Sequence, residues 1–335
     1  MQNINLTLIF ITLVYSVFFF NIHHKLAEYL NLFDFPSQRK IHKKKVPLTG
    51  GLGLITLLFL IFTLEKFRLF SFTSLFHLSI IHDNKFFYFI VLTFLIGFLD
   101  DKLTLTPLKK TIMLLFLFLI FVMDVDLLQI KNVSIYNLNL NLNYFNIQII
   151  FTTLCFFIFT NAFNMFDGIN LQTTLYSIFF LFNLYLFDNS QFLLIILFYL
   201  IVFGIYNNQT KTFLGDSGCN IISSILSVYC IKLYNLELIL IEQILILMLF
   251  PGLDMIRLFF SRIVEKKNPF VADKKHLHHY IIKSFNYNKM IYFILLILIL
   301  KSILIFYLPN IFSIMLLTTV YIISFNYAKN RSINV

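Results

Sequence analysis

The sequence predicts an all-α integral membrane protein, and two observations support this prediction. Hydrophobic residues make up 59% of the 335 residues, and charged residues only 13%. Apolar runs of about 17 to 22 residues recur along the whole length, and a helix needs roughly 20 such residues to cross a bilayer. No segment between the runs is long enough to fold alone, so residues 1–335 are expected to form a single polytopic membrane domain.

About eleven spans are expected from the apolar runs. They cover approximately residues 4–22, 47–64, 84–99, 107–123, 146–163, 171–187, 190–207, 219–235, 238–259, 288–307 and 311–327. The first run has no basic segment before it and no small-residue cleavage site after it, which favours a retained span over a signal peptide. Residues 133–147 alternate apolar residues with asparagine, which predicts a short periplasmic β-hairpin; an asparagine-rich composition explains the alternation equally well.

Basic residues orient the spans. If the first loop, with Lys25 and residues 39–45, is cytoplasmic, then 20 of the 26 basic residues lie on the cytoplasmic side, as the positive-inside rule expects. The same orientation places four polar stretches on that side: GFLDD (97–101), NAFNMFDG (161–168), FLGDSG (213–218) and the basic loop 262–280. Eight of the nine glycines lie in or beside polar stretches at the ends of apolar runs, which indicates positions that need bare backbone.

Four aspartates in these stretches are candidate catalytic residues: Asp100, Asp101, Asp167 and Asp216. Carboxylates near hydrocarbon require water or a cation, and the adjacent Asp100 and Asp101 resist simultaneous ionisation unless a cation is close. The pair fits either a Mg²⁺ site or a proton acceptor. Oxygen ligands beside lysines favour Mg²⁺ with phosphate over Zn²⁺. The alternative is interfacial carboxylates that cap helices or pair with lysine.

Polar side chains near these aspartates are candidate binding residues. Asn161, Asn164 and Asp167 recur at i, i+3 and i+6, so they share one helical stripe and can line one cavity, unless they form a chance helix cap. The GDSG turn offers backbone N–H groups to a phosphate. The histidines of HLHH favour a polyphosphate or nucleoside contact over zinc, because no cysteine is close and the spacing matches no H-E-x-x-H pattern; a solvated basic loop is the alternative.

The order of these motifs resembles the WecA-type polyprenyl-phosphate N-acetylhexosamine-1-phosphate transferases of the MraY/WecA superfamily, glycosyltransferase family 4. PSQRKIHKKKVPLTGG (36–51) is similar to that family's P-x-x-R-K-x-H-x-x-x-x-P-x-x-G-G, GFLDD to G-x-x-D-D, and NAFNMFDG to N-A-x-N-x-x-D-G. FLGDSG, PGLD (251–254) and NPFVADKKHLHH (268–279) also match in collinear order. The resemblance covers about residues 36–280.

The resemblance implies a membrane enzyme that transfers a sugar 1-phosphate from a UDP-sugar to undecaprenyl phosphate and releases UMP. It implies Asp216 and Asp167 as ligands of Mg²⁺, with Mn²⁺ as a substitute, and Asp100 and Asp101 near the lipid phosphate, with Asp100 as the favoured proton acceptor. Substrate contacts are expected from Lys45, Asn161, Asn164, His276, His278 and His279. The expected location is the bacterial inner membrane with a cytoplasmic active site. A homodimer and no nucleic-acid partner are expected.

Departures from the family pattern leave the substrate open. The family continues D-G-[ILF]-[DN]-G-L, whereas this chain has DGINLQ, with Leu171 in place of the second glycine, and GDSGS becomes GDSGC with Cys219. The sugar donor and the glycan, O-antigen of lipopolysaccharide or another cell-wall polymer, stay undecided. An MraY-like phospho-MurNAc-pentapeptide transferase and an ion-coupled transporter are the alternatives; a transporter would place polar residues in the middle of its spans.

Overall fold

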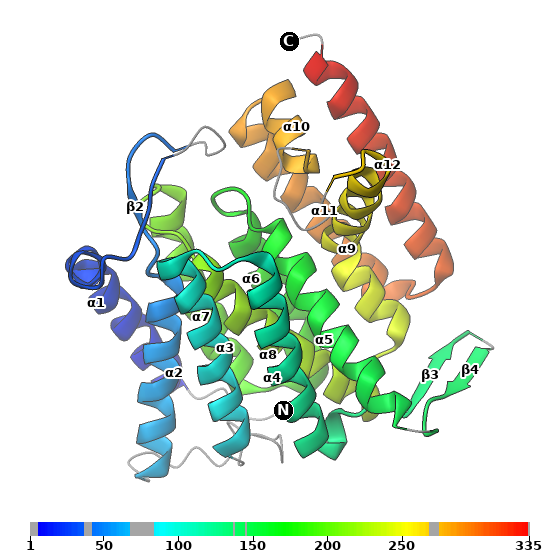
Figure 1. Cartoon of the computed structure of the whole chain (residues 1–335), viewed down its shortest axis with the longest axis horizontal. Helices are drawn as coiled ribbons and strands as arrows, with labels where there is room; N and C mark the ends of the chain where they lie inside the picture. Colours follow the sequence, from blue (N-terminus) through cyan, green and yellow to red (C-terminus); the bar gives the residue numbers. More distant parts are fainter. Residues whose placement is uncertain are drawn as a thin grey trace.

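The computed structural model describes residues 6–36, 42–67, 84–136, 138–144, 146–267 and 275–333. Within these residues the chain is a bundle of helices (Figure 1). Their bounds are α1 Leu6–Leu30, α2 Gly50–Lys66, α3 Asn84–Leu103, α4 Pro107–Asp124, α5 Ile147–Phe166, α6 Gln172–Asp188, α7 Gln191–Asn208, α8 Gly215–Asn235, α9 Ile241–Val264, α10 Leu277–Ser284, α11 Tyr287–Tyr307 and α12 Ile311–Ile333. The predicted all-α architecture is confirmed, and each expected span has a helix.

Six of the described helices are long and apolar enough to cross a membrane: α1, α5, α7, α9, α11 and α12. The other expected spans form α2, α3, α4, α6 and α8, which are shorter or more polar. Helices of this length and composition make the chain a multi-pass membrane protein. The helix α10 is too short to span, and it lies at the end of the bundle that also carries β2 (Figure 1).

Two small hairpins complete the described fold. Strands β3 (Asn132–Ile135) and β4 (Leu138–Asn141) pair antiparallel, which confirms the hairpin predicted from the alternating asparagines. Strands β1 (Phe33–Asp34) and β2 (Val46–Pro47) form the second hairpin. The two hairpins lie at opposite ends of the bundle (Figure 1).

The helix α8 forms the centre of the bundle, with nearly every residue from Ser217 to Leu233 buried. Glycines allow its neighbours to approach its backbone. A Cβ atom at Gly97 of α3 would lie 2.5 Å from the Cα of Ser217, and one at Gly51 of α2 would lie 2.3 Å from the backbone nitrogen of Gly218. These contacts confirm the need for bare backbone at the polar ends of α2 and α3.

A buried lysine supplies a hydrogen bond that a proline removes from α9. Pro251 lies inside this helix and has no N–H, so the carbonyl of Leu247 loses its donor within the helix. The side-chain nitrogen of Lys301, a fully buried residue of α11, donates to this carbonyl at 2.7 Å, and the hydroxyl of Tyr176 donates to it as well. The proline therefore leaves no unsatisfied carbonyl in the helix.

Candidate active site

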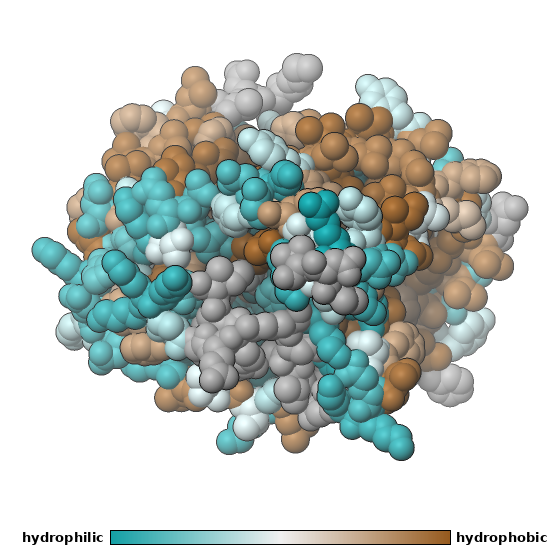
Figure 2. Space-filling model, turned by 90° about the horizontal axis from the view of Figure 1, so that it is seen from above, coloured by the Kyte–Doolittle hydropathy of each residue, from teal (hydrophilic) through white to brown (hydrophobic). Residues whose placement is uncertain are grey.

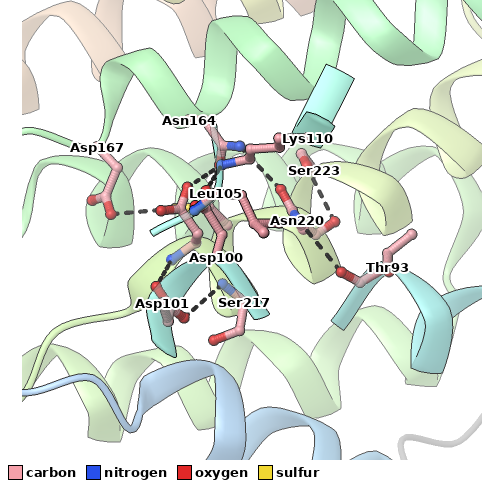
Figure 3. A network of polar contacts seen from close by, with 12 residues as sticks. Thr93, Asp100, Asp101, Leu105, Lys110, Asn164, Asp167, Ser217, Asn220 and Ser223 are labelled. Carbon is pink, nitrogen blue, oxygen red and sulfur yellow. Dashed lines mark hydrogen bonds and ion pairs between the residues drawn. The ribbon is translucent and has the colours of Figure 1, made fainter. Parts of the chain in front are cut away.

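The carboxylate of Asp101 holds the N-terminus of α8. Its Oδ1 accepts a hydrogen bond from the backbone N–H of Asp216 at 2.7 Å, and its Oδ2 accepts one from Ser217 at 3.0 Å (Figure 3). The N-cap residue Leu214 has no acceptor of its own, so α3 supplies the cap that α8 lacks. Gly215 has φ of +75°, and a Cβ there would lie 2.6 Å from the Asp101 carboxylate, which explains glycine at this position.

Lys110 joins two of the predicted catalytic aspartates. Its ammonium lies 2.9 Å from Oδ2 of Asp100 and also contacts Oδ1 of Asp216 (Figure 3). The turn between α3 and α4 places it there, because α4 begins at Pro107 with Thr106 as its N-cap. The other oxygen of Asp100 accepts from the backbone N–H of Leu105 at 2.8 Å. Lys110 is thus the basic neighbour of Asp100, whereas the adjacent Asp101 is satisfied by backbone N–H groups of α8.

The asparagine and aspartate of the NAFNMFDG stretch approach α8 from α5. Asn164 donates from Nδ2 to Oδ1 of Asn220 at 3.0 Å, and the thiol of Cys219 donates to Oδ2 of Asp167 at 3.2 Å (Figure 3). A serine at position 219, as in the family pattern, would offer the same donor with an oxygen in place of sulfur. Asn161 instead donates to the carbonyl of Phe157 within its own helix at 2.8 Å.

A second polar cluster is built on Asp254, which lies three residues after Pro251 in α9. Its Oδ2 lies 2.8 Å from Nδ1 of His276. Its Oδ1 accepts from Arg257 at 2.7 Å, from the hydroxyl of Tyr321 at 2.8 Å, and from the backbone N–H of Leu277 at 3.2 Å. This carboxylate therefore fixes the start of α10, which carries the predicted histidines, to α9 and α12.

His278 connects the two clusters. It is buried, with 3% of its surface exposed, and its Nδ1 lies 3.2 Å from Nε2 of Gln172. Its ring stacks on His276 with centroids 5.1 Å apart and meets His279 edge-on at 4.2 Å. A Cβ at Gly168 would lie 2.3 Å from Nε2 of His278, so this glycine makes room for the histidine beside Asp167.

The two clusters offer different ligand atoms to a metal ion. One ligand atom from each of Asp254, His276 and His278 lies within 4.8 Å of the others, a grouping that a transition metal could use. The Asp254 oxygens are already engaged, however, and the Arg257 guanidinium on this carboxylate opposes a cation. Asp216 also has a cationic partner, because the Lys110 ammonium contacts its Oδ1, but its side chain is 40% exposed where that of Asp254 is 6% exposed. Its carboxylate can therefore exchange the lysine for a ligand from solvent, and hard oxygen donors of this kind suit Mg²⁺.

A small cavity lies beneath the histidines. Its volume is about 30 Å³, and Gln172, Asp254 and His278 line one part of it, while mainly apolar side chains of α5, α6, α9, α10, α11 and α12 line the rest. This volume accommodates one or two water molecules and is too small for a nucleotide sugar.

The remaining predicted residue, Lys45, forms no ion pair with the candidate aspartates among the described residues. It is exposed, and its ammonium lies 4.5 Å from the centre of the Phe33 ring. The hairpin that carries it is joined to the site, because Phe213 donates to the carbonyl of Pro47 at 2.8 Å and Gly50 donates to the carbonyl of Phe213 at 3.0 Å. Residues 37–41 and 268–274, which belong to the first and last predicted motifs, lie outside the described residues.

Hydrophilic residues gather on the end of the molecule that bears α10 and β2, as the view from above shows (Figure 2). Brown, hydrophobic surface borders much of this region (Figure 2). The fold and the site together define a multi-pass membrane protein whose carboxylates, lysine and histidines meet at one end of its helices.

Comparison with known proteins agrees with this description. Residues 84–234 match the sequence profile of glycosyl transferase family 4. The chain is also 30% identical, over 272 residues, to an undecaprenyl-phosphate alpha-N-acetylglucosaminyl 1-phosphate transferase of Thermotoga maritima. That similarity covers 81% of this chain and 77% of the relative. The chain belongs to glycosyl transferase family 4, and the resemblance found in its motifs is confirmed.

Sequence reasoning missed two residues of the site, Lys110 and Asp254. The signal for Lys110 was the adjacent Asp100 and Asp101, which need a basic partner, but several lysines in the loops could have supplied it. The signal for Asp254 was its place in the PGLD motif. The structure also gives Asp101 a helix-capping role, which is the alternative that the sequence left open for these carboxylates.

Proposed function

We propose that this protein transfers N-acetylglucosamine 1-phosphate, or the 1-phosphate of a closely related amino sugar, from its UDP derivative to undecaprenyl phosphate. The products are undecaprenyl-diphospho-sugar and UMP, and the reaction begins the synthesis of a surface glycan. The similarity to the Thermotoga transferase supports both the lipid acceptor and the sugar. The site is expected to face the cytoplasm of a bacterial inner membrane, where UDP-sugars are made and where basic loops are retained.

The convergence of Asp100, Lys110 and Asp216 at the N-terminus of α8 is the observation that carries this proposal. The first turn of a helix presents N–H groups and the positive end of its dipole, which favour a phosphate group nearby. Lys110 adds a mobile positive charge that can move from a carboxylate to a phosphate oxygen. Such a site can receive two phosphorylated substrates at the membrane surface.

Asp216 and Asp167 are the residues proposed to hold Mg²⁺, with the substrate diphosphate and water as further ligands. Bound there, the ion would neutralise the charge that spreads over the diphosphate during transfer. Mn²⁺ has the same preference for oxygen ligands and is proposed as a substitute. The carboxylate of Asp216 is well exposed for this role, since Asp101 uses the backbone of Asp216 and leaves its side chain outside the helix.

The reaction joins an oxygen of the lipid phosphate to the β-phosphorus of the UDP-sugar, and the bond from this phosphorus to the bridging oxygen of UMP breaks. A phosphate monoester is largely a dianion at pH 7, because its second pKa is about 6. When the acceptor is still protonated, Asp100 is positioned to take the proton once Lys110 turns toward substrate. His278 and Asn164 lie beside the Asp167–Gly168 turn, where the nucleotide sugar is expected to bind.

Release of UMP tests the proposal. Purified protein in detergent, given UDP-N-acetylglucosamine, undecaprenyl phosphate and Mg²⁺, should release UMP in an amount equal to the lipid product. Excess EDTA and the variant Asp216→Asn should each abolish release, while the variant Asp124→Asn, at the distant end of α4, should retain it. Full activity in EDTA or in Asp216→Asn would refute the metal assignment, and a panel of UDP-sugars would identify the preferred donor.

A further inference from the structure

Gln172 contacts His278 in a way that determines where the histidine carries its proton. The amide Nε2 of Gln172 lies 3.2 Å from Nδ1 of His278, and the two residues are buried, with 1% and 3% of their surfaces exposed. An amide nitrogen of this kind can only donate. With the amide in this orientation, which leaves its buried oxygen without a partner among the described residues, Nδ1 accepts and the proton of a neutral ring lies on Nε2.

The surroundings of His278 keep its ring neutral. Burial is the main cause that lowers the pKa of His278 well below its usual value, and the nearby His279 and His276 lower it further. Asp254 on α9 would raise it, but this carboxylate is paired with His276 and Arg257. The uncharged Gln172 on α6 supplies no opposite charge.

The protonated nitrogen points at the exposed turn of the candidate active site. Among the described residues, Nε2 of His278 has no hydrogen-bond partner and is shielded from solvent. A buried N–H without an acceptor costs free energy. The nitrogen lies against Gly168, and both Gly168 and Asp167 are exposed, so a ligand oxygen at this turn would supply the missing acceptor.

We infer that Gln172 is a positioning residue that fixes His278 as a neutral Nε2–H donor for an oxygen of the nucleotide sugar at the Asp167–Gly168 turn. The inference rests on the proposed function for the identity of this ligand. The family pattern D-G-[ILF]-[DN]-G-L has leucine where this chain has Gln172, and leucine has no donor. Gln172 therefore lies where this sequence departs from the pattern.

The position of the proton can be measured without any ligand. Nitrogen-15 NMR of protein labelled at histidine, with the His278 signals assigned by their loss in His278→Asn, should show Nε2 protonated and Nδ1 bare. In Gln172→Glu the carboxylate should accept from Nδ1–H and move the proton to that nitrogen. A ligand-free spectrum of the unaltered protein with Nδ1 protonated would overturn the inference, even if the enzyme is active.

Kinetics test whether the donor serves the substrate. The variant Gln172→Leu should raise KM for the UDP-sugar about tenfold and leave kcat within about twofold, since one hydrogen bond to bound substrate is lost. Gln243→Leu is the matched control, because Gln243 is a buried glutamine whose amide donates to the carbonyl of Ile305, far from the histidines. An unchanged KM in Gln172→Leu, or an equal rise in the control, would contradict the inference. Absence of UMP release together with a protonated Nε2 would instead refute the proposed function.

Discussion

Replacement of Asp101 by asparagine should destabilise the protein, whereas the same replacement of its neighbour Asp100 should mainly affect activity. Asp101 accepts two backbone hydrogen bonds from the first turn of α8, one on each oxygen. Asparagine retains one acceptor oxygen and turns an NH₂ group toward the other N–H. Asp100 keeps its acceptor for Leu105 when it becomes asparagine, and Lys110 keeps its contact with Asp216.

The expected size of the effect follows from these bonds. Burial raises the pKa of Asp101 to about 7, so its hydrogen bonds lie between the value of about 0.5–1.5 kcal/mol for a neutral acceptor and about 1.5–3 kcal/mol for a charged one, and a buried donor left unpaired costs about 1–3 kcal/mol. Asp101→Asn should therefore lose roughly 3–4 kcal/mol. At about 2 °C per kcal/mol for a chain of this size, its Tm should fall by about 6–8 °C. Asp100→Asn loses one largely buried ion pair, but Lys110 keeps Asp216 as a partner, so the variant should lose about 1–2 kcal/mol and its Tm should fall by about 2–4 °C.

The chain provides its own reporter for this experiment. Cys219 and Cys230 are buried, so a dye that becomes fluorescent on reaction with thiols reports the unfolding of the detergent-solubilised protein. UMP release, measured below the lower Tm, should be weaker in Asp100→Asn, and the deficit should grow as the pH falls below about 6, where the acceptor phosphate is protonated and needs Asp100 as a base. Equal Tm values for the two variants, or an Asp101→Asn protein as stable as the unaltered one, would refute the capping role.

Three further predictions concern residues that the sequence did not single out or did not explain. Lys110→Met should reduce kcat by about a hundredfold or more, because it removes the charge shared by two carboxylates; Lys109→Met, at an exposed neighbour, is the control, and equal activity of the two variants would contradict the role of Lys110. Leu171 has φ of +64°, at a position where the family pattern has glycine. Leu171→Gly should therefore relieve about 1–2 kcal/mol of backbone strain, which offsets the loss of the leucine side chain. Leu171→Val keeps the strain with a β-branched residue and should have a clearly lower Tm. A Tm for Leu171→Val at or above that of Leu171→Gly would argue against strain. Lys301→Met and Tyr176→Phe should each leave the Leu247 carbonyl with one hydrogen-bond donor, and only the double variant should leave this carbonyl unpaired. The double variant should therefore lose about 1–3 kcal/mol more stability than the sum of the single changes. Additive Tm shifts would contradict the shared support of α9.

Much of the fold could be predicted because the membrane imposes simple requirements on sequence. Apolar runs of sufficient length predicted the helices, and most run ends lie within a few residues of a helix end. The largest exceptions are α1 and α12, which continue to Leu30 and Ile333, past the predicted ends at 22 and 327, because a helix can extend beyond its apolar run with polar residues. Glycine is scarce in this chain, so the presence of Gly51, Gly97 and Gly215 at the ends of apolar runs indicated positions without room for a side chain. These three glycines make close contacts around α8. The alternation of asparagine predicted the hairpin of β3 and β4.

The site was less predictable, because spacing along the chain does not reveal partners. Asp100 and Asp101 are adjacent and identical in sequence, yet one holds a helix and the other pairs with Lys110. Asn161 and Asn164 share a helical stripe, but only Asn164 reaches α8 in the described structure. The sequence showed that the chain departs from the family pattern after Asp167. Only the structure shows what this departure does: Leu171 has a left-handed backbone conformation, and Gln172 forms a hydrogen bond with His278.

The fate of the β-phosphate of the sugar nucleotide tests the central claim most directly. UDP-N-acetylglucosamine labelled with ³²P at its β-phosphate should transfer the label to undecaprenyl phosphate and leave unlabelled UMP. Recovery of the label as UDP, with an unlabelled sugar on the lipid, would show that the sugar moves without its phosphate. That result would contradict the assignment of this protein as a sugar-1-phosphate transferase.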